Sequence, residues 1–258
     1  MKKIFAVSGI VIKELYRRKD FYVLFILIVL ICLVMASVNI FNDDKIVRYL
    51  KEICLLLVWV ASLVIAITTT ARQLPAERES RTLFPLLAKP LSRTELLLGK
   101  FLGCWLACGL ALLCFYLFFG LLAGSREHHW PLTNYLQAGA LHWAMLGVVV
   151  ALTLLGSLVF SAPSSNATIC FVMVAGILLL GRHLNKFALG FPEPRRSLVY
   201  SFYYAIPHLE LFDVRDLIIH NWPPIAWRLC GVATLYAMAY TGVFLIAACL
   251  VFRRRALN

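Results

Sequence analysis

Long apolar stretches, separated by short polar segments, fill most of the chain after residue 20. A helix that crosses a membrane needs roughly 20 apolar residues. Stretches without Asp, Glu, Lys or Arg run over residues 21–42, 53–71, 101–125, 130–181 and 229–252. The fourth is too long for one helix, and turn-forming residues at 161–166 divide it in two. The pattern predicts six membrane-spanning helices, at about residues 21–41, 53–72, 100–124, 138–160, 167–186 and 228–252.

Residues 1–19 are too polar to cross a membrane, but their apolar positions have a helical period. The apolar set is Ile4, Val7, Val11 and Leu15. Charged side chains fall on the other faces of the same helix. This pattern predicts an amphipathic helix that lies at the membrane interface with its apolar side in lipid.

The longest polar segment lies between the fifth and sixth predicted spans, at about residues 186–228. It is rich in aromatic residues, which favour membrane interfaces. Leu209, Phe212 and Leu217 stand among acidic residues, a pattern typical of a short amphipathic helix. We therefore expect short outer helices here. A single all-α membrane domain then accounts for residues 1–258.

Composition supports a membrane protein. Hydrophobic residues make up 62% of the chain and the mean hydropathy is +0.84, whereas a soluble domain is about 45–50% apolar. The net charge of +12 comes from 25 basic and 13 acidic residues. Because Lys and Arg flank membrane spans and set their orientation, we expect no nucleic-acid partner. The cytoplasmic segments carry the larger share of Lys and Arg if both termini lie in the cytoplasm.

The residue types point away from catalysis. The 13 acidic residues lie outside the apolar cores of the predicted spans, whereas a proton relay needs ionisable groups within the bilayer. The sequence contains no GxxxxGK[ST] phosphate loop. Its eight cysteines form no CxxC pair. We therefore expect no catalytic residue, no cofactor, no metal site and no disulfide framework in this chain.

A densely charged segment separates the second and third predicted spans. Residues 76–100 read AERESRTLFPLLAKPLSRTELLLGK. Pro75 suits the first turn of a helix, and Glu77 and Glu79 favour the positive end of its dipole. Apolar residues at 83–87 follow, and Pro90 ends this helix. The first half of the segment thus predicts a short helix with acidic and apolar groups for a partner.

A second short helix is expected directly after Pro90. Ser92 and Glu95 match a capping box, in which the serine caps the helix and the glutamate reaches back to it. This helix can continue through Gly99 and Lys100 into the third span. The whole segment is therefore interpreted as two short helices at the cytoplasmic face.

The order of residues in this segment resembles the ABC-2 type family of transporter permeases. The family pattern is roughly E-x-E-x-G-T-L, a leucine-rich stretch, P-x-S-R-x-E and then G-K. The matching residues are Glu77, Glu79, Thr82, Leu83, Leu86, Leu87, Pro90, Ser92, Arg93, Glu95, Gly99 and Lys100. Arg81 replaces the usual glycine, and Pro85 interrupts the leucine-rich stretch.

The resemblance implies a permease subunit of an ABC transporter in the bacterial inner membrane, with both termini in the cytoplasm. Such permeases mostly export, and they pair with a second permease chain as a homo- or heterodimer within membrane lipid. Two copies of a separate ATPase would bind ATP and Mg²⁺. An accessory or periplasmic protein could join at the outer loop.

The resemblance also implies which residues dock on the ATPase. The loop after the second span would act as a coupling helix, through Glu77, Glu79, Thr82, Leu83, Phe84, Leu86, Leu87, Pro90, Ser92, Arg93, Glu95 and Lys100. Secondary contacts would come from the N-terminal helix and the turn at 161–166, at Lys13, Glu14, Arg17, Ser164 and Asn166.

Two other functions stay open at this point. An integral-membrane enzyme acting on lipid-linked substrates would need a polar cluster near one membrane face. A membrane anchor for an ATPase-regulated assembly complex would bind the ATPase but would move no solute.

Overall fold

The computed structural model describes residues 2–17, 19–37, 43–79, 92–127, 130–189, 192–193, 196–197, 200–201, 203 and 206–254. Every regular element in these residues is a helix. In chain order they are α1 (Lys2–Tyr16), α2 (Lys19–Ser37), α3 (Asp43–Arg72), α4 (Pro75–Glu79), α6 (Arg93–Glu127), α7 (Leu132–Val159), α8 (Pro163–Leu189), η1 (Leu209–Phe212), α10 (Arg215–Ile219) and α11 (Trp227–Arg254).

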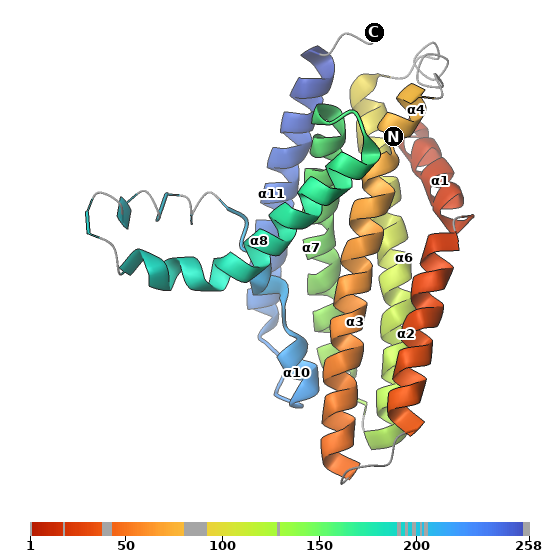
Figure 1. The fold of residues 1–258 in the computed structure, drawn as a ribbon, viewed down its shortest axis with the longest axis vertical. Helices are drawn as coiled ribbons and strands as arrows, with labels where there is room; N and C mark the ends of the chain where they lie inside the picture. The colour runs from red at the N-terminus through yellow and green to blue at the C-terminus, as the bar shows by residue number, and fades with distance from the viewer. Residues whose placement is uncertain are drawn as a thin grey trace.

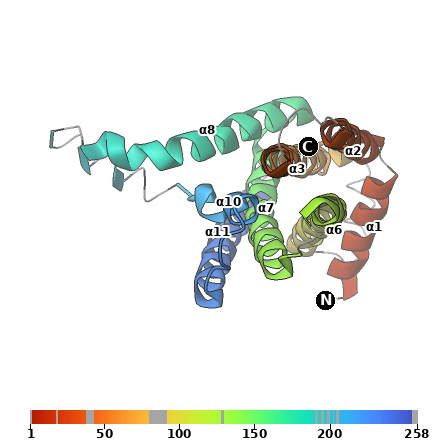
Figure 2. The same ribbon diagram turned by 90° about the horizontal axis from the view of Figure 1, so that it is seen from below.

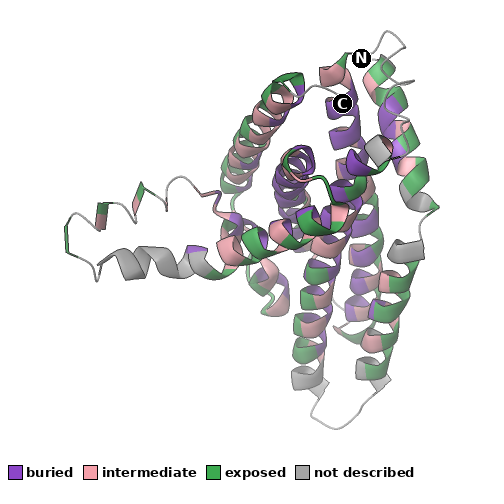
Figure 3. Ribbon diagram, turned by 45° about the horizontal axis from the view of Figure 1, so that its top comes forward, coloured by how far each residue is buried: buried purple, intermediate pink, exposed green. Residues whose placement is uncertain are grey.

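Four long helices, α3, α6, α7 and α11, form the body of an upright bundle (Figure 1). Among the described residues, four helical segments are long and apolar enough to cross a membrane: Val47–Glu77, Arg93–Glu127, Leu132–Val159 and Trp227–Arg254. They overlap the second, third, fourth and sixth predicted spans. In the apolar stretch of α7, 72% of the residues are buried, whereas in that of α11 only 17% are. α7 is therefore a central helix of the bundle, and α11 is a peripheral one. Figure 3 shows the buried residues on the facing sides of the bundle helices.

The helices at the first and fifth predicted spans differ from these four. The apolar helical stretches found there are shorter, Tyr22–Ile31 in α2 and Pro163–Leu179 in α8. α2 runs along the bundle, whereas α8 crosses it obliquely and extends away from it (Figures 1 and 2). The structure therefore supports an all-helical membrane protein with four candidate spans, and the six-span arrangement stays a prediction.

Both ends of the described chain lie at one end of the bundle (Figure 1). We call this the terminal end; it holds α1, α4, the start of α6, the turn between α7 and α8, and the last turn of α11. The opposite, distal end holds η1 and α10, into which the structure divides the short helix expected at residues 209–219. Leu209, Phe212 and Leu217 are buried there, as their spacing predicts.

The apolar side of α1 packs on α6 rather than on lipid. Val7 and Val11 are 8% and 2% exposed. A Cβ added at Gly99 would lie 2.7 Å from Val7 Cβ, and one added at Gly103 would lie 2.6 Å from Val11 Cβ. Small residues four positions apart let two helices approach closely. The prediction that this side faces lipid is therefore wrong, because the glycines of α6 offer it a closer surface.

Two tryptophans join α6 and α7 reciprocally. Trp105 Nε1 donates to the Trp143 carbonyl at 2.9 Å, and Trp143 Nε1 donates to the Trp105 carbonyl at 3.0 Å. The rings stack with centroids 4.6 Å apart. Each ring covers a glycine of the other helix, Trp105 over Gly147 and Trp143 over Gly109. The repeated W-x-x-x-G spacing is the sequence signal for this contact.

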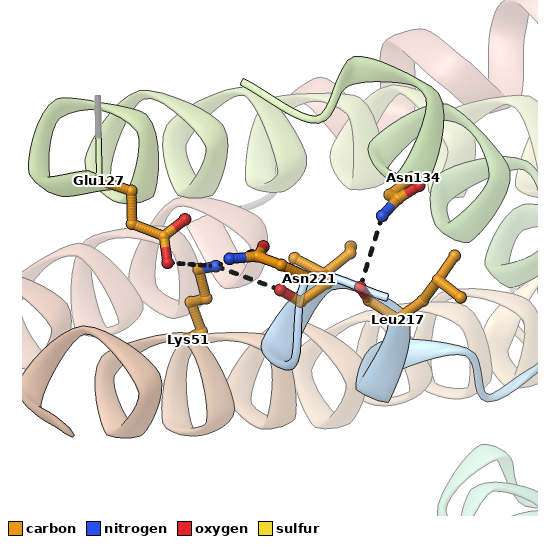
Figure 4. A network of polar contacts seen from close by, with 6 residues as sticks. Lys51, Glu127, Asn134, Leu217 and Asn221 are labelled. Atoms are coloured by element: carbon orange, nitrogen blue, oxygen red, sulfur yellow. Dashed lines mark hydrogen bonds and ion pairs between the residues drawn. The ribbon is translucent and has the colours of Figure 1, made fainter. Parts of the chain in front are cut away.

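A buried lysine joins several elements at the distal end (Figure 4). The sequence predicts a turn before residue 53, but α3 begins at Asp43 and carries Lys51 into the protein, where it is 0% exposed. Its Nζ lies 2.5 Å from Glu127 Oε1 and donates to Asn221 Oδ1 at 3.0 Å. It also donates to the Ile218 carbonyl at 3.2 Å. This lysine therefore ties α3 to α6 and to the segment before α11.

Two buried amides of α7 hold the same segment. Asn134 Nδ2 donates to the Trp222 carbonyl at 2.9 Å. Gln137 makes two hydrogen bonds to Ile225, donating to its carbonyl at 2.7 Å and accepting from its N–H at 3.0 Å. These side chains satisfy backbone groups that would otherwise lack partners. Side chains of α3 and α7 therefore fix residues 221–225 through hydrogen bonds.

One cysteine departs from the sequence expectation. Cys54 of α3 is buried and disulfide-bonded, whereas the sequence predicts no disulfide. The absence of a CxxC pair carries no information here, because helices bring together cysteines that are far apart in sequence. Six further cysteines are thiols outside any disulfide: Cys104, Cys108, Cys114, Cys170, Cys230 and Cys249.

Candidate functional site

The predicted docking segment lies at the terminal end and is described in part. α4 ends at Glu79, and α6 begins at Arg93. The predictions for Thr82, Leu83, Phe84, Leu86, Leu87 and Pro90 lie outside the described residues, as does the side chain of Glu79. The remaining members of the predicted site are Glu77, Ser92, Arg93, Glu95 and Lys100.

Glu77 and Lys100 contact each other. Lys100 Nζ lies 2.6 Å from Glu77 Oε1 and donates to Gln73 Oε1 at 3.1 Å. Lys100 is only 3% exposed. A buried charge is tolerated when it is paired and hydrogen-bonded. The structure thus brings together two residues that the sequence assigns separately to the partner surface, and it adds Gln73, which the sequence did not single out.

The capping box predicted at the start of α6 is present. Glu95 N–H donates to Ser92 Oγ at 3.2 Å, and Ser92 N–H donates to Glu95 Oε2 at 2.8 Å. The Ser92 hydroxyl also donates to Glu95 Oε2 at 3.0 Å. These hydrogen bonds lower the pKa of Glu95, and the bond from the Ser92 backbone N–H has the largest effect. Glu95 lies before the apolar part of α6. The acid is therefore ionised at neutral pH and fixes where the helix begins.

Arg93 ties the start of α6 to the end of α11. Its guanidinium donates to the Phe252 carbonyl at 2.9 Å and lies 5.7 Å from the centre of the Phe252 ring. Carbonyls in the last turn of a helix have no intrahelical partner, so a cation is stabilised there. The predicted docking role of Arg93 remains a prediction beside this observed contact.

The turn between α7 and α8 presents one predicted residue and buries another. Ser164 is exposed, whereas Asn166 is 0% exposed. Asn166 Nδ2 donates to the Thr153 carbonyl at 3.1 Å, and its Oδ1 accepts from Cys170 Sγ at 3.4 Å. Asn166 therefore holds the turn in place, and Ser164 is the side chain of this pair that a partner could reach.

A small pocket lies beside this turn. Its volume is about 260 Å³, and it is open to one side. The lining residues come from the end of α3 and the start of α8: Thr68, Arg72, Pro163, Ser164 and Ala167. The predicted residues Lys13 and Glu14 of α1, and Arg17 directly after it, are also exposed. The terminal end thus offers polar side chains from α1, α3, α6 and α8.

A buried serine–histidine pair within the bundle bears on the enzyme alternative. Ser62 Oγ lies 2.8 Å from His142 Nε2 and donates its hydrogen to the Trp59 carbonyl at 2.9 Å. The donor in the Ser62–His142 contact depends on the His142 tautomer. His142 Nδ1 is buried and has no hydrogen-bond partner among the described residues that would orient the ring as a base. His142 stacks on Trp59. The pair therefore has the geometry of a packing contact, not of an activated nucleophile.

No metal centre is formed by the side chains that the structure describes. Groups of three or more His, Cys, Asp or Glu that could hold an ion are absent from them. At the terminal end, the exposed groups include the charged side chains of Lys13 and Glu14 and the hydroxyl groups of Ser92 and Ser164.

Comparison with known proteins identifies a family. A family model described as ABC-2 family transporter protein matches residues 8–189. The matched region includes most of α1, the charged segment between α3 and α6, and all of α8. No curated protein matches the chain.

Proposed function

The chain belongs to the ABC-2 family of transporter proteins, and we propose that it docks a separate ATPase on the terminal end of its helical bundle and exports a solute. As a family member it is a multi-pass membrane permease of an ABC transporter, a class that works with an ABC ATPase. The finer elements are our proposal: a pathway formed by two permease chains, outward transport, and two copies of the ATPase. ATP and Mg²⁺ would be bound by those ATPase copies.

One observation carries the proposal. The predicted docking residues that the structure describes, although they are spread over α1, α4, α6 and the α7–α8 turn, all belong to the terminal end (Figure 1). Exposed charged residues of α1, the Ser92–Glu95 cap and Ser164 can therefore meet one partner.

Orientation follows the charge pattern. Arg253 and Arg254 are exposed at the end of α11, at the terminal end. Because Lys and Arg favour the cytoplasmic side, we place the terminal end in the cytoplasm of a bacterial cell, where an ATPase has access to ATP. The distal end would face the periplasm, and an accessory protein could bind there.

The proposal is tested by copurification with the ABC ATPase. The docking variant combines Glu79→Lys with Leu83→Asp, which reverses one charge and removes one apolar group in the predicted coupling helix. The matched control combines Asp216→Lys with Leu211→Asp, since both residues are exposed at the distal end. We expect the wild type and the control to retain the ATPase and its stimulated ATP hydrolysis, and the docking variant to lose both.

The proposal fails if the docking variant binds and stimulates the ATPase as the wild type does. Loss of binding in the control alone would place the docking surface at the distal end and would also refute it. Reconstitution in vesicles then distinguishes a transporter from an assembly anchor. If the chain is an anchor, the bound ATPase would hydrolyse ATP but no solute would cross the membrane.

A further inference from the structure

α4 is too short to hold its own position. It has five residues, and isolated helices shorter than about 12–15 residues are marginal in water. Its place at the terminal end must therefore come from contacts with longer helices. Of the side chains in α4 that the structure describes, Glu77 makes such a contact, through its ion pair with Lys100 of α6.

The Lys100 side chain is enclosed by this contact. It is 3% exposed, and its Nζ has two acceptors, Glu77 Oε1 at 2.6 Å and Gln73 Oε1 at 3.1 Å. Gln73 lies directly after the end of α3, and Glu77 lies in α4. If α4 moved away from α6 alone, it would leave a buried charge without its carboxylate, which is strongly unfavourable. The ion pair therefore makes α4 and α6 move together.

The first turns of α6 contact three neighbouring elements. Gly99 and Gly103 receive Val7 and Val11 of α1. Arg93 binds the end of α11. Lys100 binds α4. Each contact brings a separate element of the terminal end onto the same helix, and α6 then runs for 35 residues to the distal end.

We propose that Lys100 is a positioning residue which links the predicted coupling helix to α6, so that movement of a docked ATPase is passed to a membrane-spanning helix through the buried Lys100–Glu77 ion pair. This inference rests on the proposed function. It changes the role of both residues, which serve the link inside the permease and not the contact with the ATPase.

The test separates docking from coupling in the purified complex of the full chain with its ABC ATPase. Glu77→Gln removes the charge of the pair at nearly unchanged size, and Lys100→Met removes it from the other side. Two quantities are measured for each variant, the amount of ATPase that copurifies and the rate of ATP hydrolysis relative to the free ATPase. We expect ATPase binding within about twofold of wild type and at least a tenfold loss of stimulated hydrolysis.

Charge exchange tests whether the ion pair itself, and not either single side chain, carries the coupling. The double variant Glu77→Lys with Lys100→Glu restores an ion pair at the same place, so we expect stimulated hydrolysis to return to within about threefold of wild type. The matched control is Glu127→Gln, which breaks the other buried ion pair at the distal end, 2.5 Å from Lys51. Its coupling should stay at the wild-type level.

Several outcomes overturn the inference. Wild-type rates of stimulated hydrolysis in Glu77→Gln and Lys100→Met would show that the ion pair does not transmit movement from the ATPase to α6. Loss of ATPase binding in both, unrepaired by the exchange, would make them docking residues instead. Equal uncoupling by Glu127→Gln would reduce the effect to general stability. If the wild type itself retains no ATPase, the proposed function fails and the inference falls with it, whereas the other outcomes leave the proposed function intact.

Discussion

Two buried lysines, Lys51 and Lys100, stand at opposite ends of the bundle. Each is paired with a glutamate of another helix, Lys51 with Glu127 at 2.5 Å and Lys100 with Glu77 at 2.6 Å. They are 0% and 3% exposed. A buried ion pair is weak evidence for stability, but loss of one partner is strongly destabilising. Both ends of the fold therefore depend on intact charge pairs.

The distal pair allows a double-variant prediction. Lys51→Met leaves Glu127 partly buried without its cation, so we expect the free energy of unfolding to fall by about 3–5 kcal/mol. Lys51→Met combined with Glu127→Gln removes both charges and should recover most of this loss. Chemical denaturation in mixed micelles measures both changes. Equal destabilisation of the single and double variants would show that the ion pair is not what holds this end.

Neither lysine can be recognised as buried from the sequence. Residues 43–52 contain six charged side chains and lie before the predicted second span, so the sequence predicts a short outer segment that contains Lys51. The structure extends α3 through them because Glu127 and Asn221, more than 70 residues away in the chain, satisfy the lysine. The Ser92–Glu95 cap could be predicted, since both partners lie within one helical turn. The sequence thus predicts polar contacts within one helical turn, but it does not predict polar pairs between residues far apart in the chain.

At the scale of elements, α1 and α6 are the pair that the sequence describes least well. The helical period of α1 predicts the helix correctly, but a period cannot say whether an apolar side meets lipid or protein. Gly99 and Gly103 settle the question, since a Cβ at either would lie within 3 Å of an α1 valine. The G-x-x-x-G spacing in α6 was available in the sequence as a packing signal.

This contact gives a prediction with a matched control. Gly103→Ala places a Cβ 2.6 Å from Val11 Cβ and should destabilise the protein by about 1–3 kcal/mol through overpacking. Gly176→Ala in α8 meets nothing within 4 Å and should be neutral or stabilise by up to about 1 kcal/mol through helix propensity. Thermal denaturation in one detergent compares the two. Equal effects would contradict close packing of α1 on α6.

At the scale of the whole molecule, the terminal end exposes polar side chains from several of the described helices. At the distal end, Lys51 joins α3 to Glu127 and Asn221. The all-helical fold and four of the expected spans follow from hydropathy, because the lipid requirement acts on each segment by itself. The oblique course of α8 does not follow from hydropathy (Figures 1 and 2). The assignment of both ends of the chain to the cytoplasmic side remains the point on which the proposed function depends.

Orientation gives a prediction for living cells. Fluorescent protein fused to either terminus should fluoresce if both termini lie in the cytoplasm, as we propose. Alkaline phosphatase inserted at Trp222, an exposed residue of the distal segment, should be active, because it requires the periplasm. Active phosphatase at a terminus together with an inactive insertion at Trp222 would reverse the orientation and would remove the proposed docking surface from the cytoplasm.

Photo-crosslinking tests the central claim, that an ABC ATPase docks on the terminal end, most directly. A benzophenone amino acid is placed at exposed Lys13 or Ser164 of the terminal end, and at exposed Leu211 or Trp222 of the distal end. After irradiation of membranes that contain the full complex, we predict ATPase crosslinks from Lys13 and Ser164 and none from Leu211 or Trp222. Crosslinks from the distal positions, or none from the terminal ones, would contradict the account.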